Sequence, residues 1–214
     1  GDGTFRGATD LSKRGIPTIG IPGTIDNDIT STDYTIGFDT AMNTVIAMVD
    51  RLRDTCESHA RCDVVEVMGR WAGHIALRTG IATGATAIAI PEIPFDEDKA
   101  IEDIKRARAG GKRAFIVIVS EGLPGYAEQL AKTIQDKTGV ETKFARLAHV
   151  QRGGSPTVRD RVVASQMGYR AVELLMDGIG NRVVAMQKDQ IVDYDIFEAL
   201  NMKKHIDMNL YKMA

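Results

Sequence analysis

Two carboxylates with one residue between them lie in the segment Pro22–Asp28, which reads PGTIDND and also carries the hydroxyl of Thr24. In such a cluster one carboxylate, Asp26, can accept a proton from an attacking hydroxyl while the other, Asp28, holds a metal ion. The alternative is an Asx-type turn that leads to a helix cap. Because the segment directly follows the apolar run Thr18–Ile21, at the end of an expected strand, we favour the chemical interpretation.

A second candidate is the glycine motif at residues 1–4, which reads GDGT. Glycines allow a loop to approach a polyphosphate closely, and the carboxylate of Asp2 can hold Mg²⁺ directly or through water. Asp-Gly is also a common turn dipeptide, so a tight turn with no ligand is the alternative. The motif alone favours the turn.

Two further motifs follow apolar runs and carry arginine. Arg70, in the VMGR segment after the run Val64–Met68, is expected at the entrance to a helix, where its guanidinium suits a phosphoryl oxygen. A surface ion pair is the alternative for Arg70. In HVQRGGSP, which is expected to close the strand Phe144–Val150, His149 and Arg152 offer donors to a phosphate. The same segment can be a loop capped by Ser155 before a helix, and both interpretations can hold because helix N-termini bind anions.

Other polar residues carry weaker signals. Glu121 also follows an apolar run, where its carboxylate could bind a sugar hydroxyl, whereas Arg61 by itself indicates nothing. Cys56 and Cys62 flank His59, but no fourth ligand follows at a zinc-site spacing. We therefore expect reduced thiols and no zinc.

Apolar runs alternate with stretches of helical length along the chain. The runs are Thr18–Ile21, Val64–Met68, Thr86–Ile90, Ala114–Ser120, Phe144–Val150 and Arg182–Met186. The periodicity predicts helices over Ala41–Leu52, Asp96–Ala109 and Thr157–Gly178. Such alternation predicts an α/β fold with parallel sheets flanked by helices.

Composition excludes several classes. The 214 residues are 43% hydrophobic and 26% charged, with a formal charge of −2, as in an ordinary globular chain. A general electrostatic attraction to nucleic acid is not expected at this charge, and no apolar run is long enough to cross a membrane. We expect a soluble, cytoplasmic protein.

PGTIDND, VMGR and HVQRGGSP, taken in this order and spacing, resemble the bacterial ATP-dependent 6-phosphofructokinases over almost the whole chain. The resemblance implies phosphoryl transfer from ATP to the 1-hydroxyl of fructose 6-phosphate, the committed step of glycolysis, giving fructose 1,6-bisphosphate and ADP. It also implies two Rossmann-like lobes. Residues 1–37 and 151–201 would form the nucleotide lobe, and residues 38–150 and 202–214 the sugar-phosphate lobe.

The resemblance further implies a role for individual residues. Asp26 would be the general base, Asp2 and Asp28 would bind the Mg²⁺ cofactor, and Thr24 and Arg70 would steady the transferred phosphoryl group. The nucleotide would lie against Gly1, Asp2, Gly3, Thr4 and Gly7. The sugar phosphate would contact Thr24, Asp26, Arg61, Met68, Gly69, Arg70, Glu121, Lys143, His149 and Arg152.

The family is usually a homotetramer, so Arg61 and Lys143 are expected to reach the sugar phosphate from a neighbouring subunit. Lys143 stands where the family generally has arginine, which predicts a weaker grip on the 6-phosphate. An allosteric effector site would use Arg53, Gly84, Lys112 and Arg113. There Thr86 replaces an expected acid and Gly110 an expected lysine, which predicts blunted activation by nucleotide.

The chain opens at Gly1, on the glycine motif, so we expect a fragment that lacks the upstream segment of the family and is inactive alone. Glycine at both Gly3 and Gly23 favours ATP, since pyrophosphate-dependent relatives tend to carry larger residues there. Two alternatives remain: the NAD-kinase and lipid-kinase group, which shares the GDGT motif, and a noncatalytic regulatory subunit. The presence of Asp26 and Asp28 argues against the subunit.

Overall fold

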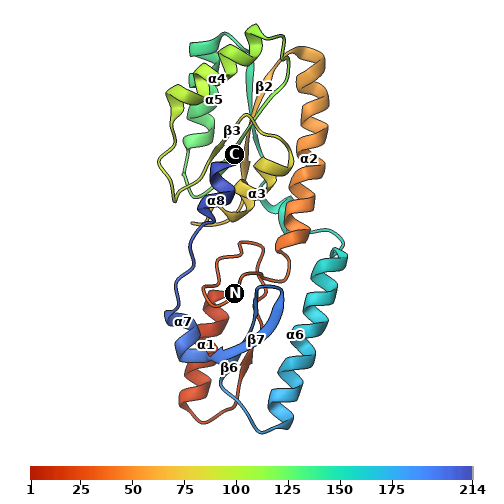
Figure 1. Cartoon of the computed structure of the whole chain (residues 1–214), viewed down its shortest axis with the longest axis vertical. Helices are drawn as coiled ribbons and strands as arrows, with labels where there is room; N and C mark the ends of the chain where they lie inside the picture. The colour runs from red at the N-terminus through yellow and green to blue at the C-terminus, as the bar shows by residue number, and fades with distance from the viewer. Residues whose placement is uncertain (214) are drawn as a thin grey trace. The chain divides into compact units, whose positions relative to one another are not determined.

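The computed structural model describes residues 1–213, except for the side chain of Asp2, and divides the chain into two compact units. The first unit comprises residues 1–40 and 155–205, and the second comprises residues 41–154 and the tail from residue 206 (Figure 1). The expected boundaries at 37, 150 and 201 compare with observed boundaries at 40, 154 and 205. The assignment of nucleotide to one unit and sugar phosphate to the other stays a prediction.

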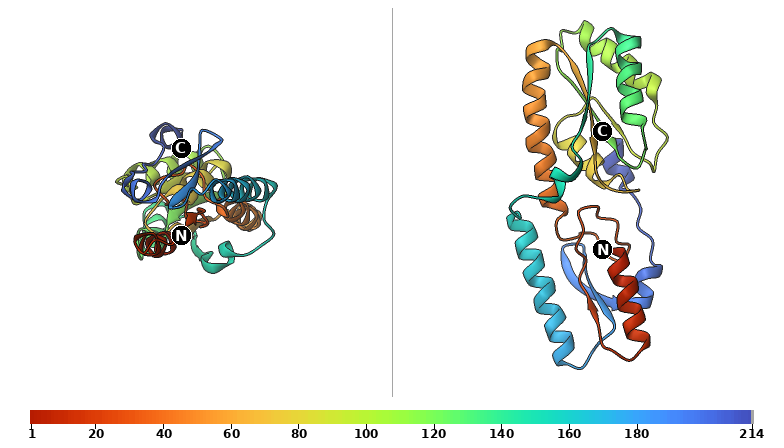
Figure 2. Two further views of the ribbon diagram at one scale, coloured as in Figure 1. Left: turned by 90° about the horizontal axis from the view of Figure 1, so that it is seen from below. Right: turned by 180° about the vertical axis from the view of Figure 1, so that it is seen from behind.

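The first unit is built on a three-stranded sheet in the order β1-β6-β7. Its strands are β1 (Ile19–Gly20), β6 (Arg182–Gln187) and β7 (Gln190–Asp195). Helices α1 (Asp2–Lys13) and α7 (Ile196–Asn201) lie on one face of the sheet and α6 (Val158–Met176) on the other (Figures 1 and 2). The sheet thus has helices on both faces, as expected for an α/β unit.

Strand β7 was not predicted from the sequence. It pairs with β6 in antiparallel fashion, whereas β1 and β6 are parallel. The connection is the two residues Lys188 and Asp189, with φ of 51° and 61°. Two successive residues of positive φ form the tight hairpin whose twist matches the strands, and its usual Asn-Gly signal is absent here.

Two expectations about helix starts are wrong. Residues 2–4 of the GDGT motif form the first turn of α1 with Gly1 as the N-cap, so the motif is neither a glycine loop nor a tight turn. Helix α6 is capped by Thr157, whose side chain accepts a hydrogen bond from the Asp160 N–H, and not by Ser155. The predicted stop near residue 178 is confirmed, because Gly178 has φ of 72° directly after the C-cap.

The second unit contains a parallel four-stranded sheet in the order β3-β4-β2-β5. Its strands are β2 (Cys62–Val67), β3 (Ala87–Ala89), β4 (Phe115–Ser120) and β5 (Thr142–Arg146). The helices are α2 (Phe38–His59), which begins in the first unit, and α3 (His74–Ala82), α4 (Glu97–Ala109), α5 (Tyr126–Thr138) and α8 (Met208–Lys212), with the 3₁₀ helix η1 at Ala148–Arg152. In a parallel sheet the carboxyl ends of the strands share one edge, where ligands bind.

Successive residues of β2 and β4 pack against opposite faces of the sheet. Val64 and Val117 join the core cluster that includes Leu130 and Ile134 of α5. On the other face Asp63 accepts a hydrogen bond from Cys56 of α2, and Ile88 leaves no room for a side chain at Gly80 of α3. Because helices cover both faces, β4 appears in the sequence as a nearly continuous apolar run, whereas the charged Asp63 and Glu66 interrupt β2.

The strand expected over Phe144–Val150 is wrong at its second half. Strand β5 ends at Arg146, and η1 begins two residues later with Ala148 in a left-handed conformation, φ 46°. An apolar run does not by itself distinguish a strand from a short helical turn. His149 and Arg152 therefore lie in a helical turn beyond the strand.

Both cysteines are buried free thiols, as expected. Burial, together with the neighbouring Asp63 carboxylate, raises the pKa of the Cys62 thiol to about 12. These thiols stay protonated and unreactive near neutral pH. None of the helices in residues 1–213 is long and apolar enough to cross a membrane.

A buried carboxylate on α6 ties together the start of α2 and the segment before it. Asp160 is 1% exposed and accepts hydrogen bonds from the Tyr34 hydroxyl at 2.5 Å, the Gly37 N–H at 2.7 Å and the Thr40 N–H at 2.9 Å. The Thr40 hydroxyl donates a fourth. Burial alone would raise the pKa of Asp160. The hydrogen bonds lower it by a larger amount, so the pKa lies below the usual 3.8.

We predict that Asp160→Asn lowers the free energy of unfolding by about 1–3 kcal/mol at pH 7, because the amide NH₂ leaves donors facing it unpaired. In the wild type, ionised Asp160 contributes to the free energy of unfolding at pH values above its unfolded-state pKa. This contribution is lost as the pH falls through its depressed folded-state pKa. Urea unfolding from pH 7 to pH 3 should therefore show a weaker acid dependence in Asp160→Asn. Exposed Asp54→Asn is the control, and equal stability of the two variants would contradict the prediction.

Candidate active site

The PGTIDND segment forms a loop that begins after β1 and closes on itself. The Thr24 N–H donates to the Ile36 carbonyl at 3.1 Å, and the Ile36 N–H donates to the Pro22 carbonyl at 2.9 Å. These bonds belong to an isolated parallel bridge between Gly23 and Ile36. The loop is therefore pinned at both ends, and the residues between them are held at the carboxyl end of β1.

Asn27 holds the middle of this loop, a role the sequence analysis missed. Its side chain is 2% exposed, and its backbone is left-handed with φ 54°. The Asn27 amide donates to the Asp33 carbonyl at 3.1 Å, and its oxygen accepts from the Thr35 hydroxyl at 3.3 Å. Asparagine tolerates this backbone conformation better than most residues. Its position between two aspartates was the available signal.

Thr24 and Asp26 contact each other directly. The Thr24 hydroxyl donates to Asp26 Oδ2 at 3.4 Å and accepts from the Asp26 N–H at 3.2 Å. Asp26 and Asp28 are both half-buried, one on each side of the buried Asn27. The loop therefore presents two carboxylates from a rigid turn, one of them oriented by a hydroxyl.

The start of α1 lies beside this loop. The amino group of Gly1 is 3.3 Å from the carbonyl oxygen of Gly23. A side chain built at Gly3, Gly7 or Gly23 would meet no atom within 4 Å, and none of the three has positive φ. Neither packing nor backbone conformation within the described residues therefore requires glycine there. The expected metal ligand Asp2 has its side chain outside the described part.

In the second unit, three expected residues form one turn after β2. Gly69 has φ 142° and Arg70 has φ 59°, an uncommon conformation for a residue with a Cβ. Glu121, directly after β4, accepts through Oε1 from the Gly69 N–H at 3.1 Å and the Arg70 N–H at 2.8 Å. The structure thus brings Glu121 to the Met68–Arg70 turn, where its Oε1 accepts hydrogen bonds from backbone groups of the turn. The Arg70 side chain is exposed.

Gln151 connects this turn to η1 and was also missed. It is 1% exposed; its Oε1 accepts from the Met68 N–H at 3.0 Å, and its Nε2 donates to the Ala148 carbonyl at 3.1 Å. On either side of it, His149 and Arg152 are exposed. The turns that follow β2, β4 and β5 therefore meet at one edge of the sheet. They carry Met68, Gly69, Arg70, Glu121, His149 and Arg152.

Arg61 and Lys143 lie at the opposite end of the same strands. Both pair with Glu141, at 2.8 Å and 3.0 Å respectively. Pairing with these two cations lowers the pKa of Glu141 to about 2. Arg61 precedes the six residues of β2 and Met68 follows them, a span of roughly 20 Å at the usual strand rise. Within one chain these cations and the Met68–Arg70 turn face different edges.

The expected effector residues also lie around the amino ends of the strands. Arg53 donates to the Thr83 carbonyl next to Gly84, and Arg113 donates to the Glu57 and Ser58 carbonyls. Lys112 lies 3.4 Å from the Thr86 hydroxyl, so the position where an acid was expected still contacts a cation through a neutral oxygen. Gly110 ends α4 as its C-cap.

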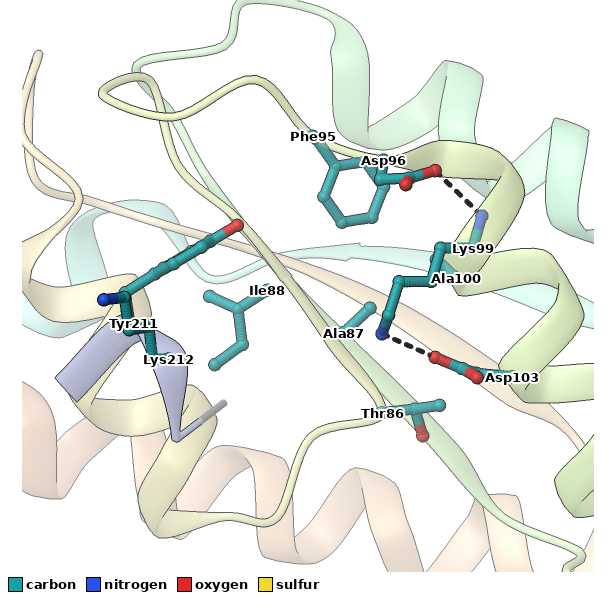
Figure 3. A pocket seen from close by; sticks show the side chains of 10 residues that line it. All are labelled: Thr86, Ala87, Ile88, Phe95, Asp96, Lys99, Ala100, Asp103, Tyr211 and Lys212. Atoms are coloured by element: carbon teal, nitrogen blue, oxygen red, sulfur yellow. Dashed lines mark hydrogen bonds and ion pairs between the residues drawn. The ribbon is translucent and has the colours of Figure 1, made fainter. Parts of the chain in front are cut away.

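A cavity of about 300 Å³ lies beside this region, against β3, α4 and α8. Phe95 and Tyr211 form part of its wall, and the ion pair of Lys99 with Asp103 forms another part (Figure 3). Thr86, which stands where an acid was expected, lines the cavity, whereas Arg53, Gly84, Lys112 and Arg113 are not among its lining residues. The cavity contains none of the expected catalytic residues.

Within the described side chains, no group of three or more His, Cys, Asp or Glu could hold a metal ion. Among the carboxylates of the first unit, Asp26 and Asp28 lie in the PGTIDND loop and are half-buried. Mg²⁺ is commonly bound through one or two carboxylates together with substrate phosphates. The loop therefore suits Mg²⁺ that arrives with a polyphosphate and does not suit a self-contained metal centre.

The phosphofructokinase family model matches residues 1–175. The chain is 53% identical over its whole length to ATP-dependent 6-phosphofructokinase 1 of Clostridium perfringens and 54% identical to the ATP-dependent 6-phosphofructokinase of Clostridium tetani. It spans 67% of the length of each of these relatives.

Among solved structures, phosphofructokinase from Saccharomyces cerevisiae superposes with a TM-score of 0.86 at 32% identity, covering 94% of this chain and 31% of that one. A pyrophosphate-dependent phosphofructokinase from Marinobacter aquaeolei gives 0.83 at 26% identity, covering 97% and 59%. The expected α/β phosphofructokinase fold is thereby confirmed. With a family model matched over residues 1–175 and relatives more than half identical, the chain belongs to the phosphofructokinase family.

Proposed function

We propose that this chain catalyses the transfer of the γ-phosphoryl group of ATP to the 1-hydroxyl of fructose 6-phosphate, giving fructose 1,6-bisphosphate and ADP. The observation that carries the proposal is the rigid loop that presents Asp26, oriented by Thr24, at the carboxyl end of β1. Relatives more than half identical are named ATP-dependent 6-phosphofructokinases, which supports ATP as donor.

Asp26 is the proposed general base. Its carboxylate takes the proton of the sugar 1-hydroxyl as that oxygen forms a bond to the γ-phosphorus and the bond from phosphorus to the ADP oxygen breaks. The Thr24 hydroxyl, 3.4 Å from Oδ2, holds the carboxylate in place for this transfer. Phosphoryl transfer depends mainly on positioning and charge stabilisation, so the guanidinium of Arg70 would steady the transferred group.

Asp28, with Asp2, would hold Mg²⁺ in this proposal, since both offer the oxygen ligands that Mg²⁺ prefers. When bound, Mg²⁺ neutralises the charge of the phosphates. The nucleotide would lie along the start of α1, against Gly1, Asp2, Gly3, Thr4 and Gly7. The open space at Gly3 and Gly23 supports this position, because no contact with the described residues accounts for glycine there.

The sugar phosphate would lie at the carboxyl edge of the second sheet. Met68, Gly69, Arg70, Glu121, His149 and Arg152 all follow strands that end there. The second carboxylate oxygen of Glu121 would accept a hydrogen bond from a sugar hydroxyl, because the hydrogen bonds from the turn go to Oε1. His149 and Arg152 would donate to the phosphate.

Arg61 and Lys143 would serve the site of a neighbouring subunit, most simply in a homotetramer. The argument is their placement: both pair with Glu141 at the amino end of β2, roughly 20 Å from Met68. Arg53, Gly84, Lys112 and Arg113 would bind an allosteric effector. With Thr86 and Gly110 in place of a carboxylate and a cation, the response to nucleotide would be blunted.

The experiment uses the full-length gene product that contains this sequence, with fructose 6-phosphate and Mg²⁺. Formation of fructose 1,6-bisphosphate is followed with ATP and, separately, with pyrophosphate. Turnover with ATP supports the proposal, whereas turnover with pyrophosphate alone would overturn the donor assignment. Binding of the sugar phosphate without turnover would favour a noncatalytic regulatory subunit.

Asp26→Asn should lower kcat by about 10²- to 10⁴-fold, because the amide cannot take the proton of the sugar hydroxyl. The Michaelis constant for ATP and the melting temperature should change little. Asp10→Asn, at an exposed position on α1, is the matched control and should keep wild-type kcat. Full turnover by Asp26→Asn would remove Asp26 from the role of base.

Lys143→Arg should lower the apparent KM for fructose 6-phosphate several-fold, on the order of a 1 kcal/mol gain, because a guanidinium binds phosphate through two parallel hydrogen bonds. Steady-state kinetics at saturating ATP measure this change. Lys132→Arg, exposed on α5, should leave KM unchanged. An unchanged or higher KM in Lys143→Arg would show that Lys143 does not contact the 6-phosphate.

A further inference from the structure

Two residues with side chains adopt left-handed backbone conformations at the carboxyl edge of the second sheet. Arg70, in the turn after β2, has φ 59°, and Ala148, at the start of η1, has φ 46°. Residues with a Cβ adopt this conformation at a cost, and they keep it only when the surrounding structure holds them. The structure should therefore contain interactions that hold both turns.

A single buried amide contacts both turns. Gln151 Oε1 accepts from the Met68 N–H at 3.0 Å, and Nε2 donates to the carbonyl of Ala148 itself at 3.1 Å. Gln151 is 1% exposed, so water cannot readily replace either hydrogen bond if it is lost, and the buried backbone group would be left unpaired. Glu121 takes the next two N–H groups of the turn, those of Gly69 and Arg70.

Glutamine suits this position because the two backbone groups need opposite partners. An N–H group requires an acceptor and a carbonyl requires a donor, and the side-chain amide offers one of each. A carboxylate could accept from Met68 but would repel the Ala148 carbonyl. A methionine of similar length would satisfy neither group.

We propose that Gln151 is a positioning residue for the sugar-phosphate site: it couples the Met68–Arg70 turn to η1, so that Arg70 on one side and His149 and Arg152 on the other keep a fixed spacing. The proposal rests on the proposed function, which assigns these three side chains to fructose 6-phosphate. Both hydrogen bonds of the Gln151 side chain go to backbone groups, so its effect on the substrate is indirect.

The single tryptophan reports on the turn directly. Trp71 is the neighbour of Arg70, is 73% exposed, and is the one tryptophan of the sequence. In Gln151→Met the turn loses one of its anchors, so the fluorescence anisotropy of Trp71 should fall and its quenching by acrylamide should rise. Both readouts need no substrate.

The control is Gln135→Met in the same unit, at a glutamine that is exposed where Gln151 is buried. Gln135 Oε1 also accepts a backbone N–H, that of Thr142 at 3.1 Å, at the amino end of β5. This variant loses the same kind of hydrogen bond away from the Trp71 turn. Its Trp71 anisotropy should match the wild type even if its melting temperature falls.

In the full-length enzyme, Gln151→Met should raise the KM for fructose 6-phosphate about tenfold, the factor that corresponds to 1.4 kcal/mol. The KM for ATP should stay within twofold of wild type, since the two hydrogen bonds of the Gln151 side chain go to Met68 and Ala148, neither of which is a proposed nucleotide residue. Gln135→Met should leave both constants unchanged. If Gln151→Met does not fold, Gln151→Glu, which keeps the acceptor and loses the donor, is measured against Gln135→Glu with the same expectation for the KM of fructose 6-phosphate.

Equal anisotropy in the position-151 and position-135 methionine variants would overturn the positioning role. A lower melting temperature with unchanged KM for fructose 6-phosphate would also overturn it, because Gln151 would then be structural only. A fall in Trp71 anisotropy in an enzyme whose wild type neither binds nor turns over fructose 6-phosphate would overturn the proposed function while leaving the coupling of the two turns supported.

Discussion

The arrangement of the first unit depends on one carboxylate placed where water cannot reach it. Burying a charge costs several kcal/mol unless hydrogen bonds replace its hydration, and Asp160 obtains four such bonds from Tyr34, Gly37 and Thr40. Tyr34 and Gly37 lie in the segment between PGTIDND and α2, and Thr40 lies in the first turn of α2. The end of the loop is thus fixed to α6 by the requirement that a buried charge be satisfied.

The same device recurs at smaller scale in both units. Asn27, Glu121 and Gln151 each hold a turn through side-chain bonds to backbone groups. Of these, Asn27 and Gln151 are buried and have no proposed contact with substrate. The exposed residues with proposed chemistry, Arg70 and His149 among them, stand in turns that buried neighbours hold. At Arg70 and His149 positioning and chemistry are therefore carried by different side chains, whereas Glu121 combines the two in the proposed function.

The sequence predicted the elements whose burial is uniform and missed those that depend on tertiary contacts. The strands under two layers of helices appear as apolar runs, and the periodic stripe of α6 marks that helix. The prediction of one strand over Phe144–Val150 was wrong, because apolar content does not distinguish the end of β5 from the helical turn η1. Strand β7 lacks the usual hairpin signal at Lys188 and Asp189.

The candidate site divides in a similar way. The sequence could indicate Asp26, Arg70 and Glu121, because each has a charged side chain that can bind or react and each follows an apolar run. Gln151 could not, since its importance lies in backbone groups up to 83 residues away in sequence. Nor could the sequence indicate that GDGT opens a helix, because glycine is a poor helix former and Asp-Gly favours turns.

The separation of Arg61 and Lys143 from the Met68–Arg70 turn has a genetic consequence under the proposed function. Each complete site would take Arg61 and Lys143 from one copy of the chain and its other residues from a second copy. A copy defective at Asp26 could still lend its cations, and a copy defective at Lys143 could still lend its catalytic loop. Mixed assemblies of two individually impaired alleles would then contain some intact pockets, and the two alleles would complement each other in one cell.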